Sequence, residues 1–329
     1  MDHVRSGSVI LRSEGLSKSY GRGLALQDLS FELHRGRVMG FLGPNGAGKT
    51  TSIRILTTIT RPSSGRFEVD GIGSEHPDRI RSRIGVLPES LGLPNQITGV
   101  EYVTYFAQLY GWRRGASRRR AHDLLEAVGL RSKGAKLIRT YSHGMRQRLG
   151  IARALVNDPV VLFLDEPVVG LDPKGQQDLL VLMRDVAVRR DAGIILCSHS
   201  LADVEGACDD VVILSAGRTV ASGPLADVLA DTSLEAAHRT ALRLRVPNTF
   251  VRRASEALGS LPQVSEVSTI VDGQLRVVVA GAAGPLPADE AANEILQCLI
   301  GADVPLLGFE IEGSRLTDVF MELTRGGSL

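Results

Sequence analysis

The chain has 329 residues, which suggests two domains, since one domain usually has about 100–200 residues. Its 38 Lys and Arg residues are balanced by 37 Asp and Glu residues, for a formal net charge of +1. This balance argues against a bulk electrostatic grip on nucleic acid. The three cysteines are Cys197, Cys208 and Cys298. They match no CxxC metal pattern, so we expect buried free thiols in a reducing compartment.

No apolar run approaches the roughly 18 residues that a membrane-spanning helix needs. The N-terminal stretch 1–15 also lacks the apolar segment of about 7–15 residues that is typical of a secretory signal. We therefore expect a cytoplasmic protein that acts at a membrane only through a partner.

The first two-thirds of the chain alternate short apolar runs with helical patterns. Strands are predicted at 37–43, 160–167 and 193–200. Helices are predicted at 50–60, ended by Pro62, and at 175–190. Short apolar runs between turn residues are typical of buried parallel strands, and their alternation with helices indicates a parallel sheet with helical crossovers.

The stretch GPNGAGKTT at 43–51 matches G-x-x-x-x-G-K-[ST] between a predicted strand and a predicted helix. Such a loop turns backbone N–H groups toward phosphate oxygens, and the following helix points its positive dipole end at them. Lys49 is expected to reach the β- and γ-phosphates of a nucleotide, and the Thr50 hydroxyl to bind Mg²⁺. The context disfavours a Gly-rich turn with a chance lysine. The predicted nucleotide-binding residues are Gly43, Pro44, Asn45, Gly46, Ala47, Gly48, Lys49, Thr50 and Thr51.

The stretch VVLFLDEP at 160–167 ends a predicted strand with two carboxylates. Asp165 is placed to ligate Mg²⁺, and Glu166 can accept a proton from an attacking water, a role worth about 10²–10⁴-fold in rate. Alone, the pair could be a solvated acidic turn. With the phosphate-binding loop it predicts a P-loop nucleotidase, without separating GTPases, kinases and transport ATPases.

The composition changes near residue 222, and a second pattern of elements follows. Strands are predicted at 241–246, on both sides of Asp272-Gly273 and at 305–312, with helices at 248–259 and 287–302. This strand–helix–strand–strand–helix–strand order is ferredoxin-like. We therefore expect an α/β nucleotide-binding domain at 8–225 and a small α+β domain at 232–329. No internal repeat is visible, so one nucleotide module is predicted.

The stretch YSHGMRQRL at 141–149 could be a plain helix start, at which a serine and free N–H groups can hold an anion. Together with the two motifs above, however, the sequence resembles the ATP-binding subunit of an ABC transporter. The signature stretch of that family, usually LSGGQ, falls here. Ser142 and Gly144 match it, whereas positions 141, 143 and 145 depart from the commonest letters. The predicted signature residues are Ser142, His143, Gly144 and Met145.

The resemblance implies a mixed sheet with a helical subdomain, and ATP and Mg²⁺ as ligands. It also implies that the signature of one subunit grips the γ-phosphate held by the other. Two nucleotides would then be sandwiched in a homodimer, which separates after hydrolysis. Glu166 and His199 become the catalytic residues of this arrangement, although a lone strand-end histidine can be a simple polar cap.

Other positions gain roles from the same resemblance. The stretch 14–33 is similar to the family's opening strands, in which Tyr20 would stack on adenine. The sequence GLDP at 170–173 matches the D-loop, so that Asp172 would line the subunit seam.

One departure concerns the metal site. The stretch IGVLPES at 84–90 aligns with the family's Q-loop, whose glutamine ligates Mg²⁺ and senses the membrane partner, but here the position holds Glu89. A carboxylate can still join Thr50 and Asp165 as a metal ligand, but it adds negative charge near the triphosphate. Either the metal holds Glu89 tightly, or the loop stands off until a partner docks.

A predicted helix and a basic run occupy 98–120. Tyr102, Phe106 and Leu109 fall on one helix face, which is either a core face or part of the dock for the membrane subunit. The basic run 113–120 is either a solvated surface or a contact with anionic lipid headgroups.

The resemblance predicts an ATPase that drives export through a separate multi-span permease at the inner face of the cell membrane. The closing stretch 315–327 resembles exporter subunits related to antibiotic and daunorubicin-resistance ATPases. The tail carries no clustered catalytic groups, so a dimerisation or regulatory role is expected for it. The alternative is a soluble ABC-type ATPase of translation or DNA repair, which the single module and the absence of a heptad run disfavour. A P-loop kinase or GTPase would leave the stretches at 141–145, 170–173 and 197–200 unexplained.

Overall fold

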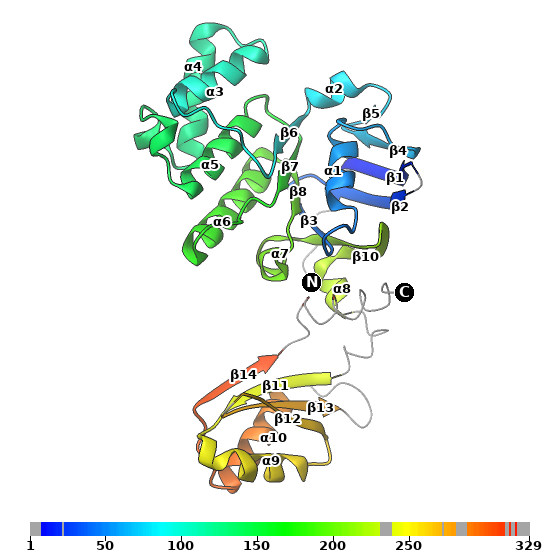
Figure 1. Cartoon of the computed structure of the whole chain (residues 1–329), viewed down its shortest axis with the longest axis vertical. Coiled ribbons are helices and arrows are strands. Elements are labelled where there is room, and N and C mark those ends of the chain that lie inside the picture. Colours follow the sequence, from blue (N-terminus) through cyan, green and yellow to red (C-terminus); the bar gives the residue numbers. More distant parts are fainter. Residues whose placement is uncertain are drawn as a thin grey trace. The chain divides into compact units, whose positions relative to one another are not determined.

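The computed structural model describes residues 8–21, 23–230, 239–271, 273–280, 288–312, 316 and 320. The chain divides into two compact units, Met1–Val228 and Leu229–Leu329 (Figure 1).

In the described part of the first unit, the strands form a ten-stranded mixed sheet in the order β5-β4-β1-β2-β10-β9-β3-β8-β7-β6. Its strands are β1 (Val9–Tyr20), β2 (Gly23–His34), β3 (Val38–Leu42), β4 (Ser64–Val69), β5 (Ile72–Gly73), β6 (Ile84–Leu87), β7 (Val161–Asp165), β8 (Gly193–Cys197), β9 (Asp210–Ser215) and β10 (Arg218–Pro224). The strands from β9 to β6 pair in parallel, as predicted, whereas β1 pairs antiparallel with β2 and β4.

The strands differ in sequence because they differ in surroundings. Every residue of β3 and β8 is buried, which is typical of parallel strands covered on both faces. Strand β2 instead alternates buried and exposed side chains along its second half, the pattern of a sheet with one face toward solvent. The parallel strands therefore form the most deeply buried part of the sheet, and the phosphate-binding loop leaves it at the end of β3.

Three of the helices of this unit form a group of their own. They are α1 (Lys49–Leu56), α2 (Pro77–Arg81), α3 (Gly99–Leu109), α4 (Arg114–Ala127), α5 (His143–Ala154), α6 (Pro173–Arg190), α7 (Leu201–Ala207) and α8 (Leu225–Ala230). Helices α3, α4 and α5 pack on one another, and α5 packs on β6, so that they form a helical subdomain beside the end of the sheet (Figure 1). This arrangement agrees with the mixed sheet and helical subdomain that the resemblance implied.

Two expectations for local structure need correction. Helix α1 ends at Leu56 rather than near Pro62, because the Thr57 hydroxyl bonds back to Ile53 O at 2.6 Å and Thr58 adopts a positive φ of 62°. The basic run 113–120 lies mostly at the surface, as one of its two readings expected: Arg113, Arg114, Arg118 and Arg119 are exposed, and most of the run forms the start of α4 over the buried Ser117.

The second correction concerns the apolar face of α3. Tyr102 is buried and its ring meets Phe106 edge-on at 5.0 Å between centroids, whereas Leu109 is 63% exposed. The three residues therefore do not form one buried face. The outer end of α3 presents apolar side chains to solvent.

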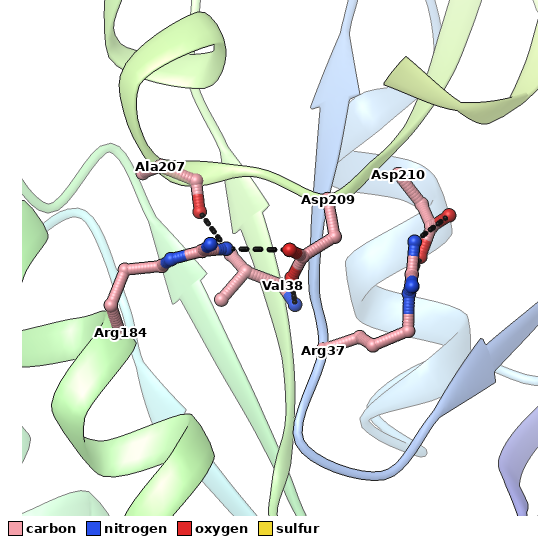
Figure 2. A network of polar contacts seen from close by, with 6 residues as sticks. All are labelled: Arg37, Val38, Arg184, Ala207, Asp209 and Asp210. Atoms are coloured by element: carbon pink, nitrogen blue, oxygen red, sulfur yellow. Dashed lines mark hydrogen bonds and ion pairs between the residues drawn. The ribbon is translucent and has the colours of Figure 1, made fainter. Parts of the chain in front are cut away.

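A polar network fixes the start of β3, the strand that leads into the phosphate-binding loop (Figure 2). Arg37 donates two hydrogen bonds to Asp210, at 2.6 and 2.7 Å, and this carboxylate raises the pKa of the arginine. Asp209 accepts from the Val38 amide at 2.9 Å and from Arg184 of α6 at 2.7 Å. Two neighbouring acids at the start of β9 thus hold β3 and α6 in fixed positions.

The described part of the second unit is an antiparallel sheet in the order β12-β13-β11-β14, with two helices. The elements are β11 (Arg239–Arg245), a short 3₁₀ turn (Asn248–Phe250), α9 (Val251–Gly259), β12 (Val264–Val271), β13 (Gln274–Ala280), α10 (Ala288–Gly301) and β14 (Gly308–Glu312). Both helices lie on the same face of the sheet (Figure 1), and their apolar residues share one core with β11 and β13. The order of elements is the ferredoxin-like one.

Some predictions on this unit fall outside the described residues. This is true of most of the closing stretch 315–327, of which the structure describes only Leu316 and Phe320.

The cysteines are free thiols. Cys197 and Cys208 are buried, as expected, and burial raises the pKa of both thiols, so that they stay neutral. Cys298 is only partly buried, which corrects the expectation for this residue. In the described part of the chain, no helix has both the length and the apolar character that crossing a bilayer requires.

Candidate nucleotide-binding site

The phosphate-binding loop joins the end of β3 to the start of α1, and close packing explains its glycines. A Cβ atom on Gly43 would lie 2.5 Å from Leu214 O and 2.8 Å from the Ala47 Cβ. Gly48 has a φ of 106°, and a Cβ there would lie 2.9 Å from Ala25 O. Only glycine fits both positions without moving the backbone of neighbouring strands.

A cavity of about 560 Å³ opens beside this loop. It is lined by Ala25, Asn45, Gly46, Ala47, Gly48, Lys49, Thr50, Thr51, Glu89, Asp165, Glu166, Val169 and His199. The structure thus brings seven consecutive residues, 45–51, together with Asp165 at the end of β7 and Glu166 directly after it, with the Q-loop position and with His199, the second residue after β8. Titratable side chains from four separate segments of the chain share one cavity.

The start of α1 leaves hydrogen-bond donors for a ligand. Its N-cap is Gly48, and no side chain caps the helix. The Lys49 ammonium donates to the carbonyl oxygens of Gly43 and Pro44, the latter at 3.2 Å, so it is held over the loop with donor capacity to spare. Free amides at a positive helix end and a lysine above them form a site that suits phosphate groups.

The acidic side of the cavity suits a cation. Burial, followed by the negative charges of Glu166 and Glu89, raises the pKa of Asp165, while Lys49 and Arg54 act in the opposite direction. A cation at Asp165 would relieve this repulsion.

The ligand set resembles that of magnesium in nucleotide enzymes. Mg²⁺ is usually held by one or two carboxylates together with substrate phosphates and water, which agrees with Asp165 and the Thr50 hydroxyl at the same cavity. Among the described residues, no three His, Cys, Asp or Glu side chains are placed to hold a metal ion by themselves. The residues therefore fit a metal that arrives with the phosphates.

Glu166 and His199 form a preassembled pair. The His199 Nδ1 atom lies 2.9 Å from a carboxylate oxygen of Glu166, and the Glu166 side chain is only 16% exposed, against 63% for His199. Glu166 has a positive φ of 49°, a strained conformation for a residue with a side chain. Its amide donates to Cys197 O at 3.0 Å, so that β7 and β8 together aim its carboxylate at the cavity.

The predicted signature begins α5. Ser142 is the N-cap, and its hydroxyl accepts from the Met145 amide at 3.3 Å. His143 Nε2 lies 2.8 Å from Val169 O, and a Cβ on Gly144 would lie 3.4 Å from the Leu171 side chain. Ser142 and His143 are exposed, yet none of residues 142–145 lines the cavity.

Four further predicted residues also lie outside the cavity lining, namely Gly43 and Pro44 of the phosphate-binding loop, Tyr20 and Asp172. Tyr20, at the end of β1, is 49% exposed, with the Lys18 ammonium 5.2 Å from its ring centroid. Asp172 is the exposed N-cap residue of α6 and makes no side-chain cap bond. Conversely, the sequence did not identify Ala25 and Val169 as lining residues, because neither belongs to a motif whose letters carry chemistry.

Comparisons with known proteins identify relatives of this chain. A family model described as "ABC transporter" matches residues 26–169. A curated relative from Streptomyces coeruleorubidus, "Daunorubicin resistance ATP-binding protein DrrA3", is 32% identical over 312 residues, which cover 94% of this chain and 94% of the relative.

Two solved structures share the fold. One, described as an ATP-binding subunit of an ABC transporter, is 32% identical with a TM-score of 0.61, and the match covers 68% of this chain and 94% of that chain. The other is a dimeric ATP-binding cassette, MJ0796, in a post-hydrolysis state bound to ADP and Pi. It is 22% identical with a TM-score of 0.59, and the match covers 66% of this chain and 99% of that one. The chain described here therefore belongs to the ABC transporter family, as an ATP-binding subunit that hydrolyses ATP.

Proposed function

We propose that this chain powers export through a separate multi-span permease, and that two copies of it clasp two ATP molecules between them. In each site, Lys49 and Thr50 of one copy hold the phosphates, while Ser142 and Gly144 of the other copy contact the γ-phosphate.

One observation carries the dimer proposal. Two helix starts suited to phosphate occur in the same unit, at Lys49 and at His143, but the cavity at the first includes no residue of the second. A single copy therefore does not bring Ser142 to its own nucleotide. A second copy can bring it there, and the dimeric ATP-binding cassette described above supports this arrangement.

The catalytic residues have distinct roles in this proposal. Glu166 accepts the proton of the attacking water, and its carboxylate is held for this task by the contact with His199 at 2.9 Å. His199 also contacts the γ-phosphate through its exposed side. Mg²⁺, bound by Thr50, Asp165 and Glu89, would neutralise charge that develops on the phosphates.

Three further roles are proposed for this chain. Glu89 lines the cavity close enough to raise the pKa of Asp165, which supports its place beside the metal. Tyr20 stacks on the adenine ring, for which its exposed ring is available. Asp172 lines the seam between the two copies.

The glutamate substitution Glu166→Gln tests the dimer. We expect it to preserve ATP binding, to reduce hydrolysis by about 10²–10⁴-fold and to accumulate an ATP-bound dimer, measured by size-exclusion chromatography with light scattering. A Lys49→Ala Glu166→Gln double variant is the matched control and should remain monomeric. An ATP-bound Glu166→Gln protein that stays monomeric at saturating ATP would overturn the proposal.

The permease contact is proposed at the outer end of α3 and the turn after it. This surface exposes Tyr105 (55%), Leu109 (63%), Tyr110 (47%) and Trp112 (37%), and clustered exposed apolar groups are typical of protein interaction sites. The match to a daunorubicin resistance protein supports export as the direction of transport. Docking there would hold the chain at the inner face of the cell membrane.

A pull-down from detergent-solubilised membranes of the source cells tests this contact. We expect a tagged chain to co-purify with a multi-span protein, and Leu109→Asp to lose it while keeping ATP binding. Co-purification with ribosomes and no membrane protein would instead favour the translation alternative, which the relatives make the weaker one.

A further inference from the structure

His143 differs from the other signature residues because its side chain binds within its own subunit. Its Nε2 atom lies 2.8 Å from Val169 O. A carbonyl oxygen only accepts, so Nε2 must carry the proton and donate. The ring also covers the next peptide, since a Cβ on Gly170 would lie 3.4 Å from the same nitrogen.

Val169 belongs to the catalytic cavity of the same subunit. It lines that cavity with Glu166 and His199, and its amide donates to Glu166 O at 3.4 Å. One turn of backbone therefore separates the residue that His143 holds from the residue that activates water. A glycine, the usual residue at this signature position, could not make the side-chain contact.

The position of His143 in the helix links this contact to the other nucleotide. His143 is the first residue of α5, directly after the Ser142 cap, and Gly144 packs beside Leu171. In the proposed dimer, this helix start touches the γ-phosphate that the partner holds. A shift of the helix start therefore moves the imidazole, and with it the turn that carries Glu166.

We propose that His143 is a positioning residue that couples the two ATP sites: through its hydrogen bond to Val169 it sets Glu166 of its own subunit according to the nucleotide that the partner presents to the signature. The inference rests on the proposed dimer. It assigns His143 an action in cis, on its own subunit's hydrolysis, and no contact with phosphate.

Substitutions with side chains of different length test the hydrogen bond from His143 to Val169 O. His143→Ala removes the donor, His143→Gln places an amide N–H near the position of Nε2, and His143→Asn is too short to reach Val169. A misplacement of about 1 Å can slow catalysis by about 100-fold, so we expect the loss of this one contact to lower kcat about tenfold in the Ala and Asn variants. The Gln variant should stay within about twofold of the parent. The exposed His122 on α4 provides the control substitution, His122→Ala, which should change nothing.

Binding measurements separate positioning from structural damage. ATP affinity, and ATP-dependent dimer formation in the Glu166→Gln background, should be unchanged by His143→Ala. A normal kcat in His143→Ala, or a Gln variant as slow as the Ala variant, overturns the inference. If Glu166→Gln binds ATP but forms no dimer, the proposed function fails instead, independently of His143.

Mixed dimers of differently tagged copies test the direction of the coupling. In the first, one copy carries His143→Ala and the other Glu166→Gln, so that the only intact Glu166 lies beside the mutated His143. In the second, one copy carries both substitutions and the other is unmodified. Relative to a dimer that carries only one Glu166→Gln, we expect slow turnover in the first and near-reference turnover in the second. The reverse result would mean that His143 acts directly on the partner's phosphate, and would overturn the inference.

Discussion

In the proposed dimer, the start of α1 in one copy and the start of α5 in the other face the same ligand. The two helix starts differ in how their first backbone amides are hydrogen-bonded. Helix α1 begins after Gly48 with no side-chain cap, so its amides are free for a nucleotide. Helix α5 begins after Ser142, whose hydroxyl accepts from the Met145 amide at 3.3 Å. The first start is therefore open to a ligand in a lone chain, whereas at the second the Met145 amide is already bonded to Ser142 before a partner presents a phosphate. This difference predicts that α1 sets affinity and α5 sets turnover.

The strongest way to break this comparison is Ser142→Glu. A carboxylate at that cap would repel the partner's γ-phosphate, and we expect turnover to fall by at least about 100-fold, the scale for losing one donor to a transition-state anion. ATP affinity of the isolated chain should stay within about twofold, because Ser142 does not line the cavity. Steady-state ATPase assays and calorimetry measure the two quantities, with the exposed Ser132→Glu as control. A large loss of affinity would show that α5 shares the chain's own site.

The next largest effect is a loss of ATP affinity at Lys49, the first residue of α1. We expect Lys49→Ala to weaken ATP binding by about 30-fold, since a charge-assisted hydrogen bond contributes about 2 kcal/mol. The exposed Lys174→Ala is the control for lost positive charge and should bind ATP normally. Calorimetric titration with ATP gives the affinity. Equal ATP affinities for the Lys49→Ala and Lys174→Ala proteins would mean that Lys49 does not bind the nucleotide, and would contradict the assignment of the phosphate-binding loop.

A third prediction concerns the acidic side of the α1 site. The pKa of Asp165 is raised in the folded chain, chiefly by burial. The folded state therefore holds this proton more tightly than the unfolded state, and stability falls as the pH rises above the ordinary aspartate pKa of about 3.9. At neutral pH, Asp165→Asn should raise the melting temperature of the ligand-free, EDTA-treated protein by about 2 °C.

The same variant provides two internal checks on Asp165. The gain in melting temperature should shrink as the pH is lowered toward 4, because the native carboxyl then becomes neutral. With Mg²⁺ and ATP the order should reverse, since the asparagine is a poorer metal ligand. A lower melting temperature for the ligand-free variant at neutral pH would contradict the inferred repulsion. Differential scanning calorimetry resolves each case.

The smallest expected effect is a change in the free energy of unfolding when the Ser142 cap of α5 is removed. The cap bond of Ser142 is long, at 3.3 Å, so Ser142→Ala should lower the free energy of unfolding by only about 0.5 kcal/mol, the low end for N-caps. Thr98 caps α3 in a complete capping box, with reciprocal bonds to Glu101, and Thr98→Ala should cost more. Urea denaturation compares the two. Equal losses would mean that the Ser142 hydroxyl is committed to its own helix.

Residues that act together within a short stretch were predictable, because spacing alone specifies their geometry. The phosphate-binding loop is one such stretch, and the carboxylates at the end of β7 are another. Their predicted roles rest on chemistry that a few consecutive residues can provide.

Contacts between distant segments were not predictable from spacing. The bond from His143 to Val169 joins residues that no motif relates, and Ala25 enters the cavity lining only because β2 passes beside the loop. The exposure of Leu109 was missed for a similar reason. Its helical spacing matches that of Tyr102, but spacing along one helix does not say which of its turns the rest of the chain covers, and Leu109 is 63% exposed.

At Glu166 the backbone conformation that favours folding and the side chain that the proposed chemistry needs call for different residues. A glycine would adopt its φ of 49° without steric cost, and would relax the turn after β7. The same replacement would delete the carboxylate that, in the proposed mechanism, takes a proton from water. Selection for thermal stability alone would favour glycine at this position, so the glutamate there agrees with its proposed role in turnover.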